Sequence, residues 1–429
     1  MSTHTLAIYS FPLGWKFVLA TLCIVLLLWV INYKFRFIAK LAELRRRPLL
    51  LFLFYFFMVL ALKWPVLNVP YGRSDITGYI LPAAEWALAH NFLPPTGSVC
   101  MGHPPFLYEV LAVSFAVTGS TEPWVSHLVV IVFAAVGLFF THLLAQHLVN
   151  GRAALLATVL LFFSDTYFHG ANGPFFGIPL AALSVMTLYF AVRQRFWLYL
   201  VSATLLVLCK IPGVLIIPGI VCYIFMREKK QGRPFSRIFF TVARYSLPCL
   251  VAAGWVVVLR LTVGAFVSEN HEFFHIAYKD NLQAFFHLLS LLFYTDYKWI
   301  LTAFVICSIP VRPREWLHID FAAFYLIILT FCVFFSFWAY HFHRYLLPVY
   351  PLLFILFGKA VYDILKNRAW IVLVIMGAIL FTKDYDRPEH FRMPWVKKKK
   401  AEWTIQKEES MTGPGYKTRP SAGIIAIDF

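Results

Sequence analysis

The stretch YGRSDITGYILPAAEWALAHNFLPPTGSVCMGHPPFLYE, residues 71–109, is the longest polar-containing segment in a chain that is otherwise mostly apolar. It places a basic residue, Arg73, two positions before an acidic one, Asp75. A helical pattern of apolar residues follows, and then His103 precedes two prolines. The flanking apolar runs approach the roughly 20 residues that span a bilayer. We therefore expect a partly helical loop on the outer membrane face that holds half of a functional site.

The composition indicates a membrane protein. Of its 429 residues 60% are hydrophobic and only 14% are charged, whereas a soluble protein is about half apolar and a quarter charged. An unpaired backbone group in hydrocarbon costs several kcal/mol, so the spanning segments must be helices. The sequence predicts an all-α polytopic membrane protein. The formal charge of +17 lies in short loops between spans, where it sets topology and meets anionic headgroups, and we expect no nucleic-acid partner.

Basic loops set the expected topology. The loop at 34–47 and the sequence REKKQGRPFSR at 227–237 are strongly basic, which is typical of cytoplasmic loops. We expect about twelve transmembrane helices with helical extracytoplasmic loops, and a helix at 104–119 along the outer surface. The expected spans are 14–33, 48–67, 125–148, 153–167, 175–192, 196–209, 214–225, 238–261, 299–309, 321–338, 346–361 and 370–381.

This topology divides the chain into three parts. Residues 1–47 would form an extra N-terminal span and a basic cytoplasmic loop, and 383–429 a basic tail. Residues 48–382 would form the transmembrane core, with outer loops at 68–124 and 263–297.

The expected outer face gathers several cations. Lys210 would lie at the outer tip of a helical hairpin, Arg344 would begin another span, and Arg73 lies beside the acidic residue. Cations at headgroup level suit a phosphate-linked lipid. Lys210 and Arg344 can equally be anchors whose charged ends reach the membrane surface.

Asp75 allows two interpretations. A carboxylate in this loop can act as general base toward a hydroxyl or amine. It can equally be the N-cap of the helix that follows, a role that Ser74 also suits. His103 before two prolines is held in an extended backbone, where its imidazole can meet a phosphate or merely face water.

The sequence also contains a literal H-E-x-x-H at His271, Glu272 and His275. On a helix this spacing puts two imidazoles on one face for zinc, with the glutamate as base. No glycine-containing zincin extension follows, and third ligands are unspecific. A membrane zinc protease is the less favoured interpretation, although the cluster stays a candidate for metal or acceptor binding.

In these residues the chain resembles the GT-C membrane glycosyltransferases, specifically the superfamily of protein O-mannosyltransferases and lipid A aminoarabinose transferases, over roughly residues 48–364. Order and spacing together carry the resemblance. The matching motifs are DITGY at 75–79, HPPFLY at 103–108, CKIPG at 209–213 and RYLLP at 344–348.

The resemblance implies inverting transfer of a sugar from a polyprenyl- or dolichyl-phosphate carrier to an acceptor. It implies that Asp75 is the catalytic base. The positions that it places around the donor phosphate and substrate are His103, Lys210, Arg344 and Tyr345, with Arg73 nearby.

The chain departs from the family in several places. The family often has Asp-Glu where this chain has Asp75 and isoleucine, and its second outer-loop aspartate aligns with Gly177. Asp165 or His169 is a candidate substitute, for acceptor or metal binding. The second outer loop holds no inserted sugar-binding domain, which argues against a standard eukaryotic protein mannosyltransferase.

The sequence therefore predicts a glycosyltransferase that moves a hexose or pentose to a glycolipid, cell-envelope polysaccharide or protein. No cofactor is required by the sequence, although a divalent metal is compatible with it. We expect a bacterial or archaeal cell membrane rather than the endoplasmic reticulum, with the site on the extracytoplasmic side. A lipid or solute transporter or flippase is the alternative, and it predicts polar residues in mid-span.

Overall fold

The computed structural model describes residues 47–71, 75–96, 99–263, 278–295, 298–338, 343–369 and 371–372. All of them belong to one compact unit, residues 1–381. The expected first span at 14–33, Arg73, the H-E-x-x-H motif at 271–275, and the tail at 383–429 lie outside the described residues.

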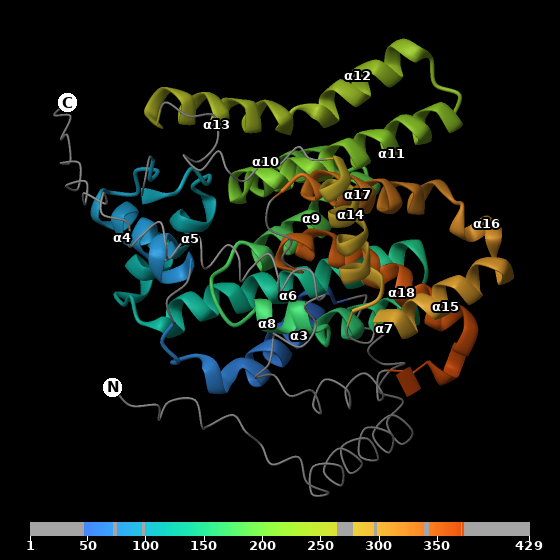
Figure 1. Cartoon of the computed structure of the whole chain (residues 1–429), viewed down its shortest axis with the longest axis horizontal. Helices are drawn as coiled ribbons and strands as arrows, with labels where there is room; N and C mark the ends of the chain where they lie inside the picture. Colours follow the sequence, from blue (N-terminus) through green and yellow to red (C-terminus); the bar gives the residue numbers. More distant parts are fainter. Residues whose placement is uncertain are drawn as a thin grey trace, which may run out of the picture. The chain divides into compact units, whose positions relative to one another are not determined.

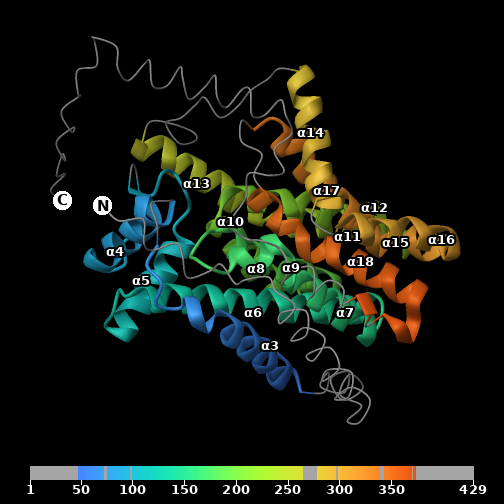
Figure 2. The same ribbon diagram turned by 60° about the horizontal axis from the view of Figure 1, so that its bottom comes forward.

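The described chain is helical throughout its regular elements (Figures 1 and 2). The elements in the first half are α3 (Pro48–Lys63), η2 (Trp64–Val66), the π-helical η3 (Ile76–Ile80), α4 (Leu81–Ala89), α5 (Phe106–Thr118), α6 (Pro123–Leu148), α7 (Gly151–Phe162), α8 (Asp165–Gly170), α9 (Gly177–Val192) and α10 (Phe196–Cys209). Those in the second half are η5 (Ile211–Leu215), α11 (Ile216–Lys230), α12 (Phe235–Ser246), α13 (Pro248–Val263), α14 (Tyr278–Phe293), α15 (Lys298–Val311), α16 (Pro313–Trp316), α17 (Ile319–Ser336), η7 (His343–Val349), α18 (Tyr350–Leu365) and η8 (Lys366–Arg368).

The long helix α6 forms the centre of the bundle. It packs against α3, α7 and α9, and α18 covers the other side of α7. Small residues permit the closest approach: a Cβ on Gly358 of α18 would lie 2.7 Å from the Cβ of Ala157 in α7. The buried core is dominated by Leu, Ile, Val, Phe and Ala, as expected of helices that pack by shape rather than by expulsion from water.

Four helical segments are long and apolar enough to cross a bilayer: α6, Ile211–Lys230, α17 and His343–Leu365. Two bent pairs, α12 with α13 and α14 with α15, bring the number to as many as six within the described residues. Five more apolar helices, among them α5, are shorter than a full span. The all-helical membrane architecture is thus confirmed, and the number of twelve stays a prediction.

The single span expected at 238–261 is instead two helices. α12 and α13 meet at a bend of 42°, and Pro248 begins the second helix. Proline has no N–H to continue the helical ladder, and its ring collides with the preceding turn. Within residues 263–297, expected to form an outer loop, α14 is a 16-residue helix that packs on α17.

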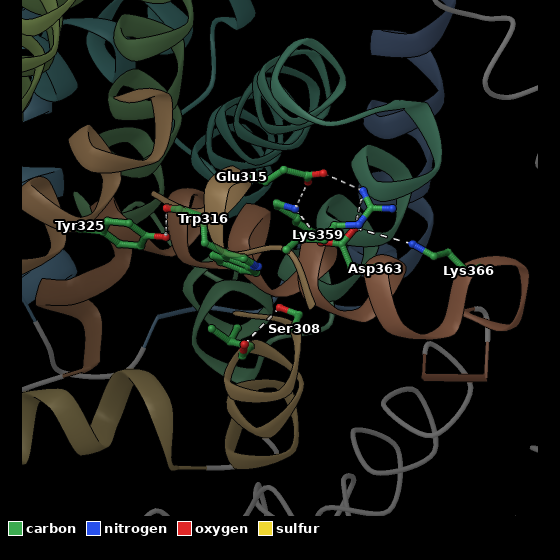
Figure 3. A network of polar contacts seen from close by, with 9 residues as sticks. Ser308, Glu315, Trp316, Tyr325, Lys359, Asp363 and Lys366 are labelled. Carbon is green, nitrogen blue, oxygen red and sulfur yellow. Dashed lines mark hydrogen bonds and ion pairs between the residues drawn. The ribbon is translucent and has the colours of Figure 1, made fainter. Parts of the chain in front are cut away.

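An ion-pair network ties the far end of α18 to α16 (Figure 3). Lys359 and Asp363, each only 2% exposed, pair at 2.5 Å between Nζ and Oδ2. Lys359 also donates to Glu315 at 2.7 Å, and Arg312 approaches both Glu315 and Asp363. Arg344, by contrast, lies in η7, which leads into the start of α18. One helix therefore joins two polar regions at opposite ends of the bundle.

Candidate functional site

Asp75 and Arg344 form an ion pair at 3.0 Å, with both side chains 40% exposed. Asp75 directly precedes η3, yet its side chain makes no capping hydrogen bond there. The carboxylate thus faces Arg344 instead of the helix that it precedes. The structure favours the interpretation in which Asp75 belongs to a polar site, although more than 260 positions separate the pair in sequence.

Lys210 joins this pair from the break between α10 and η5. The break is tight: a Cβ on Gly213 would lie 2.6 Å from the carbonyl oxygen of Leu206. The ammonium group of Lys210 lies 5.3 Å from the ring centre of Phe176 and 5.5 Å from that of Tyr345. Burial, and then the nearby Arg344 guanidinium, lower the pKa of Lys210 to about 8.

His103 completes the cluster from a turn before α5. The backbone N–H of His103 donates a hydrogen bond to the carbonyl oxygen of Cys100 at 2.9 Å, and Gly102 adopts a left-handed φ of +74°. The imidazole packs between the rings of Tyr79, at 5.6 Å, and Phe176, at 5.0 Å. Burial, and then the charge of Lys210, hold the pKa of His103 well below its usual range.

The cluster carries more positive than negative charge. Lys210 and Arg344 face one carboxylate, Asp75, and each cation perturbs a neighbour that would also be positive. Burial, and then Asp75, raise the pKa of Tyr79, so this phenol stays a hydrogen-bond donor. Cations that are crowded and half-buried favour an anion at the same place.

Tyr345 forms one wall of the site. Its ring stacks on Phe335 at 5.2 Å with planes only 2° apart, while Arg344 lies 5.6 Å from the ring of Phe175. Aromatic faces thus border both cations, which is a favourable cation–π arrangement.

Asp165 and His169 form a different cluster. They lie one turn apart on α8 and contact each other at 3.4 Å. Asn172 links His169, at 3.3 Å, to the buried ammonium of Lys63, at 2.6 Å. This second cluster joins the end of α3 to α8, and α8 in turn packs on η7, the element that carries Arg344.

Gly177 begins α9 beside the site. A Cβ here would lie 2.6 Å from Cδ1 of Leu347 and 3.5 Å from the carbonyl oxygen of Arg344. The position that the resemblance aligns with an aspartate is thus closely packed in this chain, which favours the glycine that is present.

Several site neighbours were missed from the sequence. Tyr79 follows Asp75 by one helical turn, which is a signal that could have found it. Phe175 and Phe176 carry no such signal, because their place depends on how α9 meets η7. Lys63 was missed because it stands at the end of an apolar run, where a lysine usually extends its charged end to the membrane surface.

The described residues contain no group of three His, Cys, Asp or Glu side chains that could hold a metal ion. The H-E-x-x-H motif lies outside those residues, so its role stays a hypothesis.

The arrangement of the helices is shared with solved structures of another membrane protein. Two solved structures of ArnT from Cupriavidus metallidurans are similar to this chain. The one bound to undecaprenyl phosphate has a TM-score of 0.58 and 18% identity, covering 76% of this chain and 63% of that one. The apo structure has a TM-score of 0.55 and 19% identity, covering 75% and 62%.

A comparison of sequences found one further relative. An uncharacterised protein of Aquifex aeolicus is 24% identical over 212 residues, which are 46% of this chain and 40% of that protein. No family model matches the chain. The chain thus spans about three fifths of the ArnT chains and two fifths of the Aquifex protein. The resemblance expected from the motifs is confirmed as a likeness of fold.

Proposed function

We propose that the chain is an integral membrane glycosyltransferase that moves a sugar from a polyprenyl-phosphate carrier to an extracytoplasmic acceptor. The observation that carries the proposal is the convergence of Asp75, Lys210 and Arg344, drawn from three distant segments, at one end of the bundle. A fold shared with a protein solved with undecaprenyl phosphate supports this class of donor.

In the proposed reaction Asp75 accepts the proton from an acceptor hydroxyl or amine as that atom bonds the anomeric carbon. The bond between the anomeric carbon and the phosphate oxygen breaks, and its electron pair leaves with the lipid phosphate. Attack opposite the leaving group inverts the anomeric centre. Lys210 and Arg344 stabilise the charge that develops on the phosphate, which is the effect expected of cations fixed before the reaction.

The Asp75–Arg344 pair has a role in this scheme. A bound phosphate would compete for the Arg344 guanidinium, which binds phosphate and carboxylate oxygens equally well in geometry. Donor binding would then release the carboxylate for proton transfer. Such a coupling keeps the Asp75 carboxylate paired with Arg344 until the lipid-phosphate donor is bound.

The surroundings of Lys210 argue against a simple surface anchor. A snorkelling lysine extends to water, whereas Lys210 is half-buried between two aromatic rings and has a lowered pKa. We propose the sugar only as a class, a hexose or pentose. We propose the acceptor likewise as a class: a glycolipid, a cell-envelope polysaccharide or a protein. The extracytoplasmic side follows from the basic loops.

The test is transfer of radiolabelled sugar from a polyprenyl-phosphate donor pool to native membrane extract by purified protein. Asp75→Asn should reduce transfer at least a hundredfold, because general-base catalysis contributes about 10²–10⁴-fold. It should keep donor binding, because the phosphate contacts remain. Glu85→Gln, which removes an exposed carboxylate from α4, is the matched control and should transfer normally.

The outcomes are distinct. Loss of transfer in Asp75→Asn with donor binding retained supports the assignment of the base. Equal transfer by wild type and Asp75→Asn would overturn the assignment of Asp75. Absence of transfer from every lipid-linked sugar would overturn the class of enzyme and favour transport.

A further inference from the structure

A cavity of about 220 Å³ lies at the end of the bundle opposite the candidate site. Three arginines from two helices line it: Arg227 of α11, and Arg237 and Arg244 of α12. The volume is several times the roughly 30 Å³ that one water occupies in the liquid. It therefore has room for a phosphate group.

The helix geometry separates this cavity from the candidate site. α10 ends directly before Lys210, while its first residue, Phe196, lines the cavity. Its 14 residues span about 21 Å at 1.5 Å per residue. α11 runs in the opposite sense, back from the break beyond Lys210 to Arg227 in its last turn. The cavity is thus a second site, not an extension of the first.

The three guanidinium groups are arranged as a cradle. Arg237 and Arg244 lie seven residues apart, which is two turns, and so share one face of α12. Arg244 lies 4.0 Å above the ring of Phe196, and Arg227 donates to the carbonyl oxygen of Val192 at 3.4 Å. Two of the three arginines, Arg227 and Arg244, are therefore approached by a group that restrains their position.

The charge of the cradle is not balanced by protein. Glu228 is the one carboxylate that lines the cavity. None of the three guanidinium groups forms an ion pair with a carboxylate among the residues that the structure describes. Planar guanidinium groups bind phosphate oxygens through paired hydrogen bonds. The cavity thus favours an anion that presents several oxygens.

The exposed phenylalanines of α12 indicate where this anion comes from. Phe235, Phe239 and Phe240 are 75%, 60% and 68% exposed. Exposed apolar surface next to arginines is typical of a helix that lies in the membrane interface. In Figure 1, α12 and α13 run along one edge, above α10 and α11, to which the contacts tie them. The cavity therefore opens where lipid headgroups lie.

We propose that this cavity binds the phosphate headgroup of an anionic phospholipid from the leaflet at the far end. By its basic loop at 227–237 that leaflet is the cytoplasmic one. The phenylalanines of α12 enter the acyl boundary, while Arg227, Arg237 and Arg244 hold the headgroup. This site is independent of the proposed transfer reaction.

The test is a titration of detergent-purified protein with phosphatidylglycerol, counting bound lipids by native mass spectrometry. Phosphatidylcholine, glycerol 3-phosphate and inorganic phosphate are titrated in parallel. Arg237→Gln with Arg244→Gln should weaken phosphatidylglycerol binding at least tenfold. The matched control, Lys230→Gln with Arg233→Gln, removes two charges from the adjoining turn and should change binding less than twofold.

A second variant covers the case in which the double arginine variant fails to fold. Thr241 also lines the cavity, and Thr241→Trp fills it while keeping all three arginines. It should weaken phosphatidylglycerol binding to a similar extent. Arg344→Gln, at the candidate donor site, should leave this binding unchanged.

Three results would overturn the proposal. Equal losses in the cavity variant and the adjoining-turn variant would mean diffuse charge attraction. Equal binding of phosphatidylcholine would exclude headgroup selection. Binding of glycerol 3-phosphate or inorganic phosphate as tight as that of phosphatidylglycerol would assign the cavity to a soluble anion.

Discussion

At the scale of single residues, the candidate site places two cations, Lys210 and Arg344, close enough to repel each other. Burial, and then the Arg344 guanidinium, lower the pKa of Lys210, and both cations lie in a site that has one carboxylate. Such crowding costs free energy in the empty protein, and an incoming phosphate relieves it. The strain is therefore of the kind found at functional sites.

The pKa of Lys210 leads to a prediction on pH. Because this pKa is lowered to about 8, the ammonium loses its proton as the pH rises from 7 to 9. Phosphate binding needs the charged form, so affinity for a polyprenyl phosphate should fall over that interval. The measurement is equilibrium binding of fluorescent polyprenyl phosphate at constant ionic strength.

Lys210→Arg is the matched control for this titration. A guanidinium stays charged throughout the interval, so its affinity should vary with pH less than twofold. If wild type and Lys210→Arg lost affinity in parallel, the titrating group would be another residue.

The residues also reveal what sequence alone can predict. The motifs at 75–79, 103–108, 209–213 and 344–348 predicted a cluster, and the structure brings Asp75, His103, Lys210 and Arg344 together. Asp165 or His169 was expected as a substitute for a missing acid, and the two residues contact each other within α8. Chain order alone does not predict which neighbours such residues meet, because that depends on packing.

At the scale of elements, apolar runs predicted most helices. The bounds of α10 match the expected 196–209, since basic residues and the Lys-Ile-Pro-Gly break flank its run. The bend between α12 and α13 was missed because Pro248 lies within a continuous apolar run. The aromatic face of α12 was likewise missed, as hydropathy averages over the two faces of a helix.

The contact between α7 and α18 permits a test of packing. A Cβ on Gly358 would lie within 2.8 Å of backbone atoms of Ala157, so Gly358→Val should destabilise the protein by about 1–3 kcal/mol or more. Gly254→Ala is the control, because nothing lies within 4 Å of its added Cβ. Thermal unfolding in detergent measures both, and an unchanged midpoint for Gly358→Val would contradict the observed packing.

At the scale of the whole described unit, polar groups collect at two ends of an apolar bundle. α9 and α11 run from the candidate site toward the three arginines, α10 runs back from the arginines to the site, and α18 runs from the segment of Arg344 to the Lys359–Asp363 pair. The sequence predicted one of these ends, by its motifs. The other end looked like ordinary basic loops, because the cavity depends on a helix that folds back.

The two ends should respond separately to mutation. Asp363→Asn leaves the buried Lys359 with Glu315 as its remaining carboxylate. The loss should be at most about 3–5 kcal/mol, the range for breaking a buried pair. Thermal unfolding should show the loss, while polyprenyl-phosphate affinity of the folded protein stays within twofold. A large drop in affinity would mean that the ends are coupled.

The pairing of Lys359 and Asp363 within one helix bears on how the chain enters the membrane. A charge raises the apparent cost of translocon insertion by about 2.5–3.5 kcal/mol at a helix centre and by less toward its end, where these two residues lie. These two residues are four apart on α18 and bond each other at 2.5 Å, so they can neutralise each other in the nascent helix, before any neighbouring helix has arrived. The helix can therefore leave the translocon as a nearly uncharged segment, and a chain that carries only one of the two residues would be expected to stall during biogenesis.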